Sequence, residues 1–412
     1  MSVRYGKEQE RDWNTLSAAE FRGIVRAEFE ANCPAALRYP PRRLRWRENR
    51  HWYLRMAEKG WTAPNWPAEY GGMGLSPAKL LIFQEESERW GIARFQDHGI
   101  LMLGPVLIRW GTDEQRRRYL PGVLSCEAIW CQGYSEPGAG PDLSSLETKA
   151  VCDGGEFVIT GQKIWTTLAQ DATHMFLLAR TDSGAKKQEG ISFILIDFAQ
   201  EGVSVRPIRD IAGHEEFCEV FLDGVRTPVS NLVCELNKGW TVAKSLLRFE
   251  RIHVGSPKMP EYGRTILETV ARARGVWDDP AFREKYTALK LDVVHLADAY
   301  HHFTGIVVRG GPLGQDVSYL KIWATDTFQR IADLVVETAG PFAAVHGEVE
   351  IAGTSVDVLA SFYKARPPTI YSGSSEIQRT SSPSKCLDCR GGRLRSRTAI
   401  GERNEFRPNK TA

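Results

Sequence analysis

The chain has 412 residues, a length that corresponds to two or three domains with sizeable cores. Apolar residues make up 42% and charged residues 25%, a balance that excludes a disordered chain, a collagen and a small disulfide-bonded scaffold. The 53 Lys and Arg residues nearly balance the 51 Asp and Glu residues, so the overall charge of +2 gives no reason to expect binding to nucleic acid or to an anionic membrane.

The sequence predicts a cytoplasmic protein. The opening segment, MSVRYGKEQERDW, carries charges where a signal peptide needs an apolar core. The longest apolar runs, such as residues 191–196, have the length of a strand, so we expect no transmembrane helix. The eight cysteines lack the spacing of a secreted domain, and we therefore expect reduced thiols.

Residues 1–127 are predicted to form an N-terminal helical domain. Ser17 and Glu20 have the spacing of a capping box at a helix start. Residues 77–90 have helical periodicity without an internal breaker, and Thr112 is placed to cap a further helix. A Gly- and Pro-rich loop at 61–75 separates the helices.

Residues 128–238 are predicted to form a central β domain. Asp153-Gly154-Gly155 followed by an apolar run at 156–160 indicates a hairpin. Further strand-like segments occur at 164–167, 175–179, 190–198 and 217–222.

Residues 239–379 are predicted to form a C-terminal helical bundle, in which 318–338 is a long helix that ends at Gly340-Pro341. The predicted class is therefore α+β multidomain, with helices, then strands, then helices. No repeat of 20–50 residues occurs.

Two motifs in the β domain carry the most information. Residues 134–140 read YSEPGAG, and residues 161–167 read GQKIWTT. A Gly-rich turn alone is weak evidence, and the Walker pattern GxxxxGK[ST] is absent. The combination resembles the acyl-CoA dehydrogenase family, whose motifs are close to TEPGAGSD and GxKxWITN. Residues 66–72 and 220–228 also resemble family segments, and the order of the three domains is the family's.

The resemblance implies FAD between the β domain and the C-terminal helices. Gln132, Tyr134 and Ser135 are expected to border the flavin through backbone N–H groups and a hydroxyl. Trp165 is expected to pack against the flavin, with the Thr167 hydroxyl near its N5 atom; a core aromatic is the competing interpretation of Trp165. The other expected FAD contacts are Gly140, Thr166 and Ser374.

The substrate side departs from the family pattern at two positions. Pro141 stands where family members have a serine that contacts CoA, and proline has no N–H or hydroxyl to donate. Ser372 stands where most members have the glutamate that removes the α-proton. Ser372 and Gly373 remain expected substrate contacts, because the Ser372 N–H can polarise the thioester carbonyl.

The predicted catalytic base is therefore Glu250. Some family members place this glutamate on the first long helix after the β domain, just before an arginine, and here Glu250 precedes Arg251. Arg251 is expected beside the thioester. The competing interpretation is an exposed Glu–Arg pair on a helix.

The leading prediction is an FAD-dependent acyl-CoA dehydrogenase that desaturates an acyl-CoA at the α,β position and passes electrons to an electron-transfer flavoprotein. Two alternatives remain: a catalytically degenerate subunit of a heteromer, and a flavin monooxygenase or oxidase on the same fold. A homo- or hetero-oligomer, either dimer or tetramer, is expected. We expect no metal site, because His301-His302 and the C-x-x-C of Cys386 and Cys389 lack the partners of one.

The family resemblance stops after Arg379. Residues 380–391 read TSSPSKCLDCRG, whereas family chains usually continue as a helix resembling NIISKQVLGLPR. With suitable codons, the second peptide read one base out of frame gives the first. We hypothesise a single-base deletion at or near the Arg379 codon, and we expect the tail at 380–412 to be disordered.

Overall fold

A computed structural model describes residues 11–40, 42–93, 98–311 and 313–381, apart from the side chains of residues 247–253, 315, 380 and 381. The predictions for the first ten residues, for the tail after Ser381 and for Cys386 and Cys389 lie outside the described residues.

The N-terminal part is helical, as predicted. It contains α1 (Ala18–Asn32), α2 (Trp46–Lys59), α3 (Pro77–Trp90), α4 (Gly104–Trp110) and α5 (Asp113–Leu124). The capping box at α1 forms: the Glu20 N–H donates to Ser17 Oγ at 3.2 Å, and the Ser17 N–H donates to Glu20 Oε2 at 2.9 Å. Thr112 caps α5 in the same way.

An eight-stranded sheet follows. Its strands are β1 (Trp130–Gly133), β2 (Lys149–Asp153), β3 (Glu156–Thr167), β4 (His174–Arg180), β5 (Ile191–Asp197), β6 (Val203–Ile208), β7 (Phe217–Pro228) and β8 (Leu232–Val233). The strand order is β6-β7-β3-β2-β4-β5-β8, and β1 pairs with β4 in parallel. The hairpin predicted at 153–156 joins β2 to β3.

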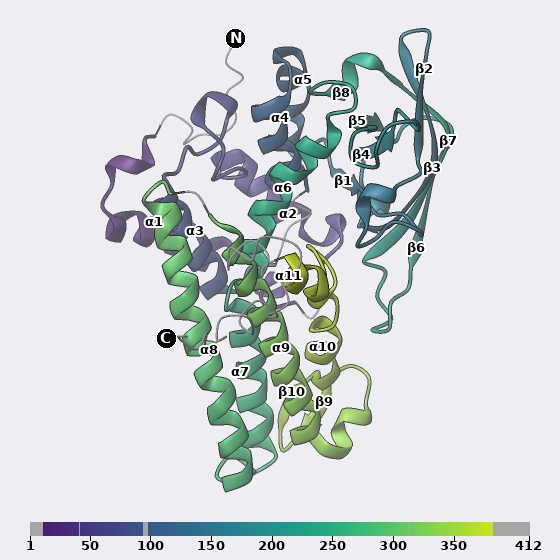
Figure 1. Cartoon of the computed structure of the whole chain (residues 1–412). Helices are drawn as coiled ribbons and strands as arrows, with labels where there is room; N and C mark the ends of the chain where they lie inside the picture. Colours follow the sequence, from purple (N-terminus) through teal and green to yellow (C-terminus); the bar gives the residue numbers. More distant parts are fainter. Residues whose placement is uncertain (1–10, 41, 94–97, 312, 382–412) are drawn as a thin grey trace, which may run out of the picture.

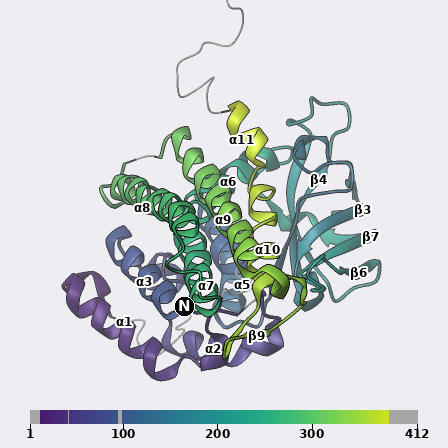
Figure 2. The same ribbon diagram turned by 90° about the horizontal axis from the view of Figure 1, so that it is seen from below.

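The C-terminal part contains α6 (Gly239–Val254), α7 (Lys258–Ala273), α8 (Pro280–Val308), α9 (Ser318–Ala339), α10 (Val358–Lys364) and α11 (Ser375–Ser381). The predicted helical–β–helical order is confirmed. The predicted boundaries fall in the connections between α5 and β1 and between β8 and α6. The sheet lies to one side of the helices, and α10 and α11 lie between α9 and the sheet (Figures 1 and 2).

One element inside the predicted helical region is not helical. A short hairpin joins β9 (Val349–Ile351) to β10 (Thr354–Val356). Ala352 and Gly353 have φ angles of 48° and 81°, the conformation of a two-residue hairpin turn. The sequence analysis missed this hairpin, because two three-residue strands are too short to show a clear period of two.

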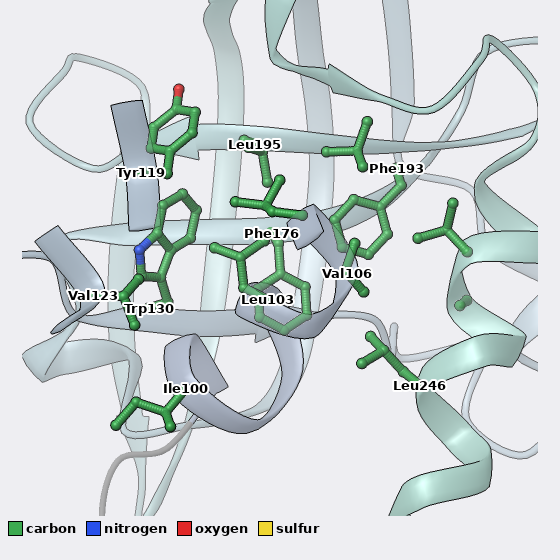
Figure 3. Close-up of a cluster of buried hydrophobic side chains, with 14 of the residues drawn as sticks. Ile100, Leu103, Val106, Tyr119, Val123, Trp130, Phe176, Phe193, Leu195 and Leu246 are labelled. Carbon is green, nitrogen blue, oxygen red and sulfur yellow. The ribbon is translucent and has the colours of Figure 1, made fainter. Parts of the chain in front are cut away.

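A single apolar cluster joins the three parts of the chain. Leu103 and Val106 come from the N-terminal part, Trp130 and Phe176 from the sheet, and Leu246 from α6, and all five are buried. In Figure 3 the two N-terminal residues lie between the strands and α6. Burial of apolar surface therefore holds α6 against both the sheet and the N-terminal helices.

Candidate active site

A bulge in β3 turns Trp165 out of the sheet core. Phe157, Ile159 and Lys163 are buried at alternate positions, so an uninterrupted strand would bury residue 165 too. The pairing of β3 with β7 is irregular between Lys163 and Thr166. Trp165 accordingly has a φ of 58° and is 56% exposed, whereas Thr166 is buried. The bulge thus presents a large indole on the surface of the sheet.

The structure brings two segments of the predicted flavin site together. The N–H of Ile164, next to Trp165, donates to the Ser135 carbonyl at 2.9 Å. Gln132, Ser135 and Thr167 are half-buried. The hydrogen bond therefore places the loop that follows β1 beside the last part of β3.

Two predicted contacts turn their side chains into the core. The Tyr134 ring packs edge-on against Phe176 and Phe193, with centroids 6.0 and 6.5 Å apart. Thr166 Oγ1 is buried and is among the described side-chain atoms that have no hydrogen-bond partner. Any contact that Tyr134 or Thr166 makes with a ligand on the Trp165 surface therefore involves the backbone. Gly140 and Pro141 lie exposed in the turn after β1.

A buried ion pair that the sequence analysis missed holds these segments in place. Lys163 Nζ lies 2.7 Å from Glu136 Oε1 and donates to the carbonyls of Leu178 at 2.7 Å and Tyr134 at 3.3 Å. The Glu136 carboxylate also accepts from the N–H groups of Glu147 at 2.6 Å and Thr148 at 3.0 Å. The pair therefore ties the loop after β1 to β3 and β4.

The electrostatics of this pair follow from its burial. Burial lowers the pKa of Lys163 to about 8, although Glu136 opposes the shift. Burial acts to raise the pKa of Glu136, but Lys163 and the Glu147 N–H outweigh it, and the pKa falls below its ordinary value. Both groups are therefore mainly charged near pH 7. A sequence signal existed, because Lys163 occupies an inward position and a buried lysine needs a partner.

The turn before α11 is held in an unusual conformation. Ser372 and Gly373 have φ angles of 56° and 85°. The fully buried Lys321 donates from Nζ to the Gly373 carbonyl at 2.8 Å, and Gln378 Nε2 donates to the Ser372 carbonyl at 3.1 Å. Burial lowers the pKa of Lys321 to about 8. Two buried side chains thus fix the backbone where most family members place a glutamate.

Ser374 has a structural role in the same turn. Its Oγ accepts from the Ile377 N–H at 3.4 Å, and its carbonyl accepts from the Gln378 N–H at 2.9 Å. Ser374 therefore lies at the start of α11, and its contact with a cofactor stays a prediction. Glu250 and Arg251 lie in the last turns of α6, but their side chains are outside the described ones.

A cavity of about 1240 Å³ lies between the three parts of the chain. Its wall includes Phe83 of α3, Val254 at the end of α6, Tyr262 of α7, Phe217 of β7 and Tyr371 before α11. None of the predicted site residues is among its described lining residues. Two of its lining residues nevertheless adjoin them: Tyr371 precedes Ser372, and the Phe217 ring contacts the Trp165 ring edge-on at 5.9 Å.

Within the described ranges, no group of three or more His, Cys, Asp or Glu residues is placed to hold a metal ion. No helix in the described part of the chain is long and apolar enough to cross a membrane.

Three sequence models of one family match consecutive parts of the chain. The acyl-CoA dehydrogenase N-terminal domain matches residues 17–127, the middle domain residues 131–225 and the C-terminal domain residues 237–382. The chain therefore belongs to the acyl-CoA dehydrogenase family, whose members are flavoprotein oxidoreductases that act in acyl-CoA catabolism.

Several relatives are similar over most of their length. The acyl-CoA dehydrogenase IpdE1 of Mycobacterium tuberculosis is 38% identical over 81% of this chain and 86% of that protein. The solved Tcur3481-Tcur3483 steroid ACAD is 31% identical, has a TM-score of 0.81 and covers 90% of this chain and 97% of its own. The ChsE4-ChsE5 complex of Mycobacterium tuberculosis is 28% identical, with a TM-score of 0.75 over 95% of this chain and 100% of that chain.

Proposed function

We propose that this chain catalyses the FAD-dependent α,β-desaturation of a bulky, polycyclic acyl-CoA thioester and passes the electrons to an electron-transfer flavoprotein. The observation that carries the proposal is the cavity of about 1240 Å³ that reaches both Phe217, in contact with Trp165, and the Tyr371 turn. Ligand cavities for drug-sized molecules are usually about 300–1,000 Å³, so this one has room for a polycyclic acyl group. A relative described as a steroid ACAD supports the same substrate class.

The residues at the ends of β1 and β3 fit a flavin. An indole that is 56% exposed on a bulged strand offers a flat apolar surface. Ser135 and Thr167 are half-buried beside it and supply hydroxyls, while the backbone of residues 132–135 supplies N–H groups. When bound there, FAD supplies the acceptor for the hydride that leaves the β-carbon.

The protein's own contribution is proton removal and stabilisation of the charge that develops on the thioester. In our proposal, Glu250 takes the α-proton and the Ser372 N–H donates to the thioester carbonyl. Position 250 lies four residues after Leu246, which is buried against the sheet, and four before Val254, which lines the cavity. All three positions share one stripe of α6, and this placement supports position 250 as that of the base.

The test is anaerobic single-turnover bleaching of the bound flavin by a panel of acyl-CoAs. Glu250→Gln keeps the shape and removes the proton acceptor, so bleaching should slow by about 10²–10⁴-fold while acyl-CoA binding persists. Glu261→Gln is the matched control, since Glu261 also lines the cavity but lies on α7. Unchanged bleaching in Glu250→Gln would rule out this base.

A second candidate is a non-catalytic subunit that supports an active partner. Ser372 in place of the usual glutamate favours it, and one relative, ChsE4-ChsE5, was solved as a complex of two components. Bleaching by the isolated chain distinguishes the candidates, provided that the sample is loaded with FAD. No bleaching with any acyl-CoA, together with activity after addition of a partner chain, would favour the second candidate.

A further inference from the structure

Lys364 stands out among the charged groups of the cavity wall. It ends α10 and lies on the lining of the cavity together with Tyr262 and Pro40. Its side chain is exposed and borders the cavity. A lysine in that position presents its ammonium group to whatever fills the cavity.

The protein provides Lys364 with little compensation for its charge. Its Nζ lies 3.5 Å from the Pro40 carbonyl, at the limit of a hydrogen bond, and 5.3 Å from the centre of the Tyr262 ring. No described carboxylate forms an ion pair with it. The surrounding protein lowers its pKa by desolvation although the side chain is exposed, nearby Lys258 lowers it further, and Glu216 opposes both.

Three arginines of the wall differ from Lys364. Arg42 pairs with Glu48 at 2.6 Å, Arg89 with Glu30 at 2.6 Å, and Arg366 with Asp333. Their charges are matched by carboxylates of the protein. An anion that reaches Lys364 gains a charge-assisted hydrogen bond to an ammonium group that no described carboxylate matches.

We propose that Lys364 forms a subsite for a carboxylate on the acyl part of the substrate, remote from the thioester. The inference rests on the proposed function, because it assumes that the acyl group fills this cavity. The aromatic side chains Phe83, Tyr262 and Tyr371 take up the apolar body of the acyl group, and Lys364 pairs with its charged end. The substrate class is then a polycyclic acyl-CoA that carries a second, free carboxylate.

The test measures equilibrium binding to the FAD-loaded full chain by titration calorimetry. The probes are octanedioyl-, dodecanedioyl- and hexadecanedioyl-CoA, each compared with the methyl-ended acyl-CoA of equal length. The three lengths of flexible chain cover different distances between the thioester and Lys364. We expect at least one diacid to bind about 10- to 100-fold more tightly than its methyl-ended counterpart, as a charge-assisted hydrogen bond provides.

Three variants test whether Lys364 causes the preference for a diacid. Lys364→Met should abolish it while leaving the affinity for methyl-ended thioesters unchanged, and this second result also shows that the variant folds. Lys364→Arg keeps the charge and should retain most of the preference. Lys290→Met, on the exposed surface of α8, is the matched control and should behave as the wild type.

Each other outcome counts against the subsite. If methyl-ended thioesters bind but no diacid is preferred, the subsite is wrong and the proposed function stands. If a preference survives in Lys364→Met, another residue binds the carboxylate. If neither series binds, the proposed function fails and the subsite fails with it.

Discussion

Removal of Lys163 should destabilise the β domain far more than the loss of a surface ion pair. Lys163 is fully buried, and its Nζ lies 2.7 Å from the Glu136 carboxylate. Lys163→Met leaves that carboxylate buried with only the N–H groups of Glu147 and Thr148. Breaking one side of a buried pair typically costs about 3–5 kcal/mol, so we expect a loss of that size in the free energy of unfolding.

The assay is urea unfolding of the apoprotein, followed by circular dichroism at pH 7. Arg226→Met is the matched control in the same domain, since Arg226 is 51% exposed and pairs with Asp153 and Glu156 on the surface. Surface pairs contribute about 0–1 kcal/mol. The double variant Glu136→Gln/Lys163→Met should recover to within about 1–2 kcal/mol of the wild type, because it buries no uncompensated charge.

The reasoning is refuted if Lys163→Met costs no more than Arg226→Met. It is refuted equally if the double variant is less stable than Lys163→Met, because the damage would then come from lost packing and not from an unpaired carboxylate. The same ion pair holds the loop after β1 in place, so Lys163→Met should also weaken FAD binding. Titration of the apoprotein with FAD measures this effect.

Two further predictions concern the edges of the site. Trp165→Ala should change the free energy of unfolding by less than about 1 kcal/mol, because the indole is 56% exposed, but it should weaken FAD binding about tenfold. Trp130→Ala, at a buried position, is the control and should cost about 3–5 kcal/mol. Equal losses in urea unfolding would contradict the assignment of Trp165 to the flavin-binding surface. Lys321 has a folded-state pKa of about 8, below that of the unfolded chain, so the unfolded state binds more protons between about pH 8 and 10.5 and stability rises with pH through that window. In urea unfolding, the free energy of unfolding should rise between pH 7.5 and pH 10 by roughly 1–3 kcal/mol more in the wild type than in Lys321→Met. A parallel pH dependence in the two would rule this out.

Much of the fold could be predicted from local sequence patterns. Three such patterns appear in the structure: the capping box of Ser17, the uninterrupted helical periodicity of residues 77–90 and the Gly-rich hairpin before residue 156. Each depends only on residues that are neighbours in the chain. The hairpin at 349–356 was missed because its strands are three residues long. A strand of three residues is hardly longer than one period of two, so its alternation carries no clear signal.

The site was harder to predict because its geometry depends on partners distant in sequence. Lys163 meets Glu136 across 27 positions, and Lys321 meets Gly373 across 52. Each lysine could be recognised as inward-facing from its periodicity, but no local rule names the acceptor. The motif resemblance predicts the segments of the site and not the side chains that hold them in place.

The bulge in β3 shows how a single irregularity decides what the motif does. An ideal strand would place Trp165 on the same side as Ile159 and Lys163, inside the domain, where a tryptophan is a core residue. One shift of register between Lys163 and Thr166 exchanges the two sides, so that the indole faces outward and the threonine inward. The positive φ of 58° at Trp165 is a cost that a non-glycine residue carries only where the surrounding structure enforces it. Here the enforcing contacts are the Lys163 ion pair on one side and the Ile164–Ser135 hydrogen bond on the other, so the stability of the β domain and the exposure of Trp165 depend on the same few residues.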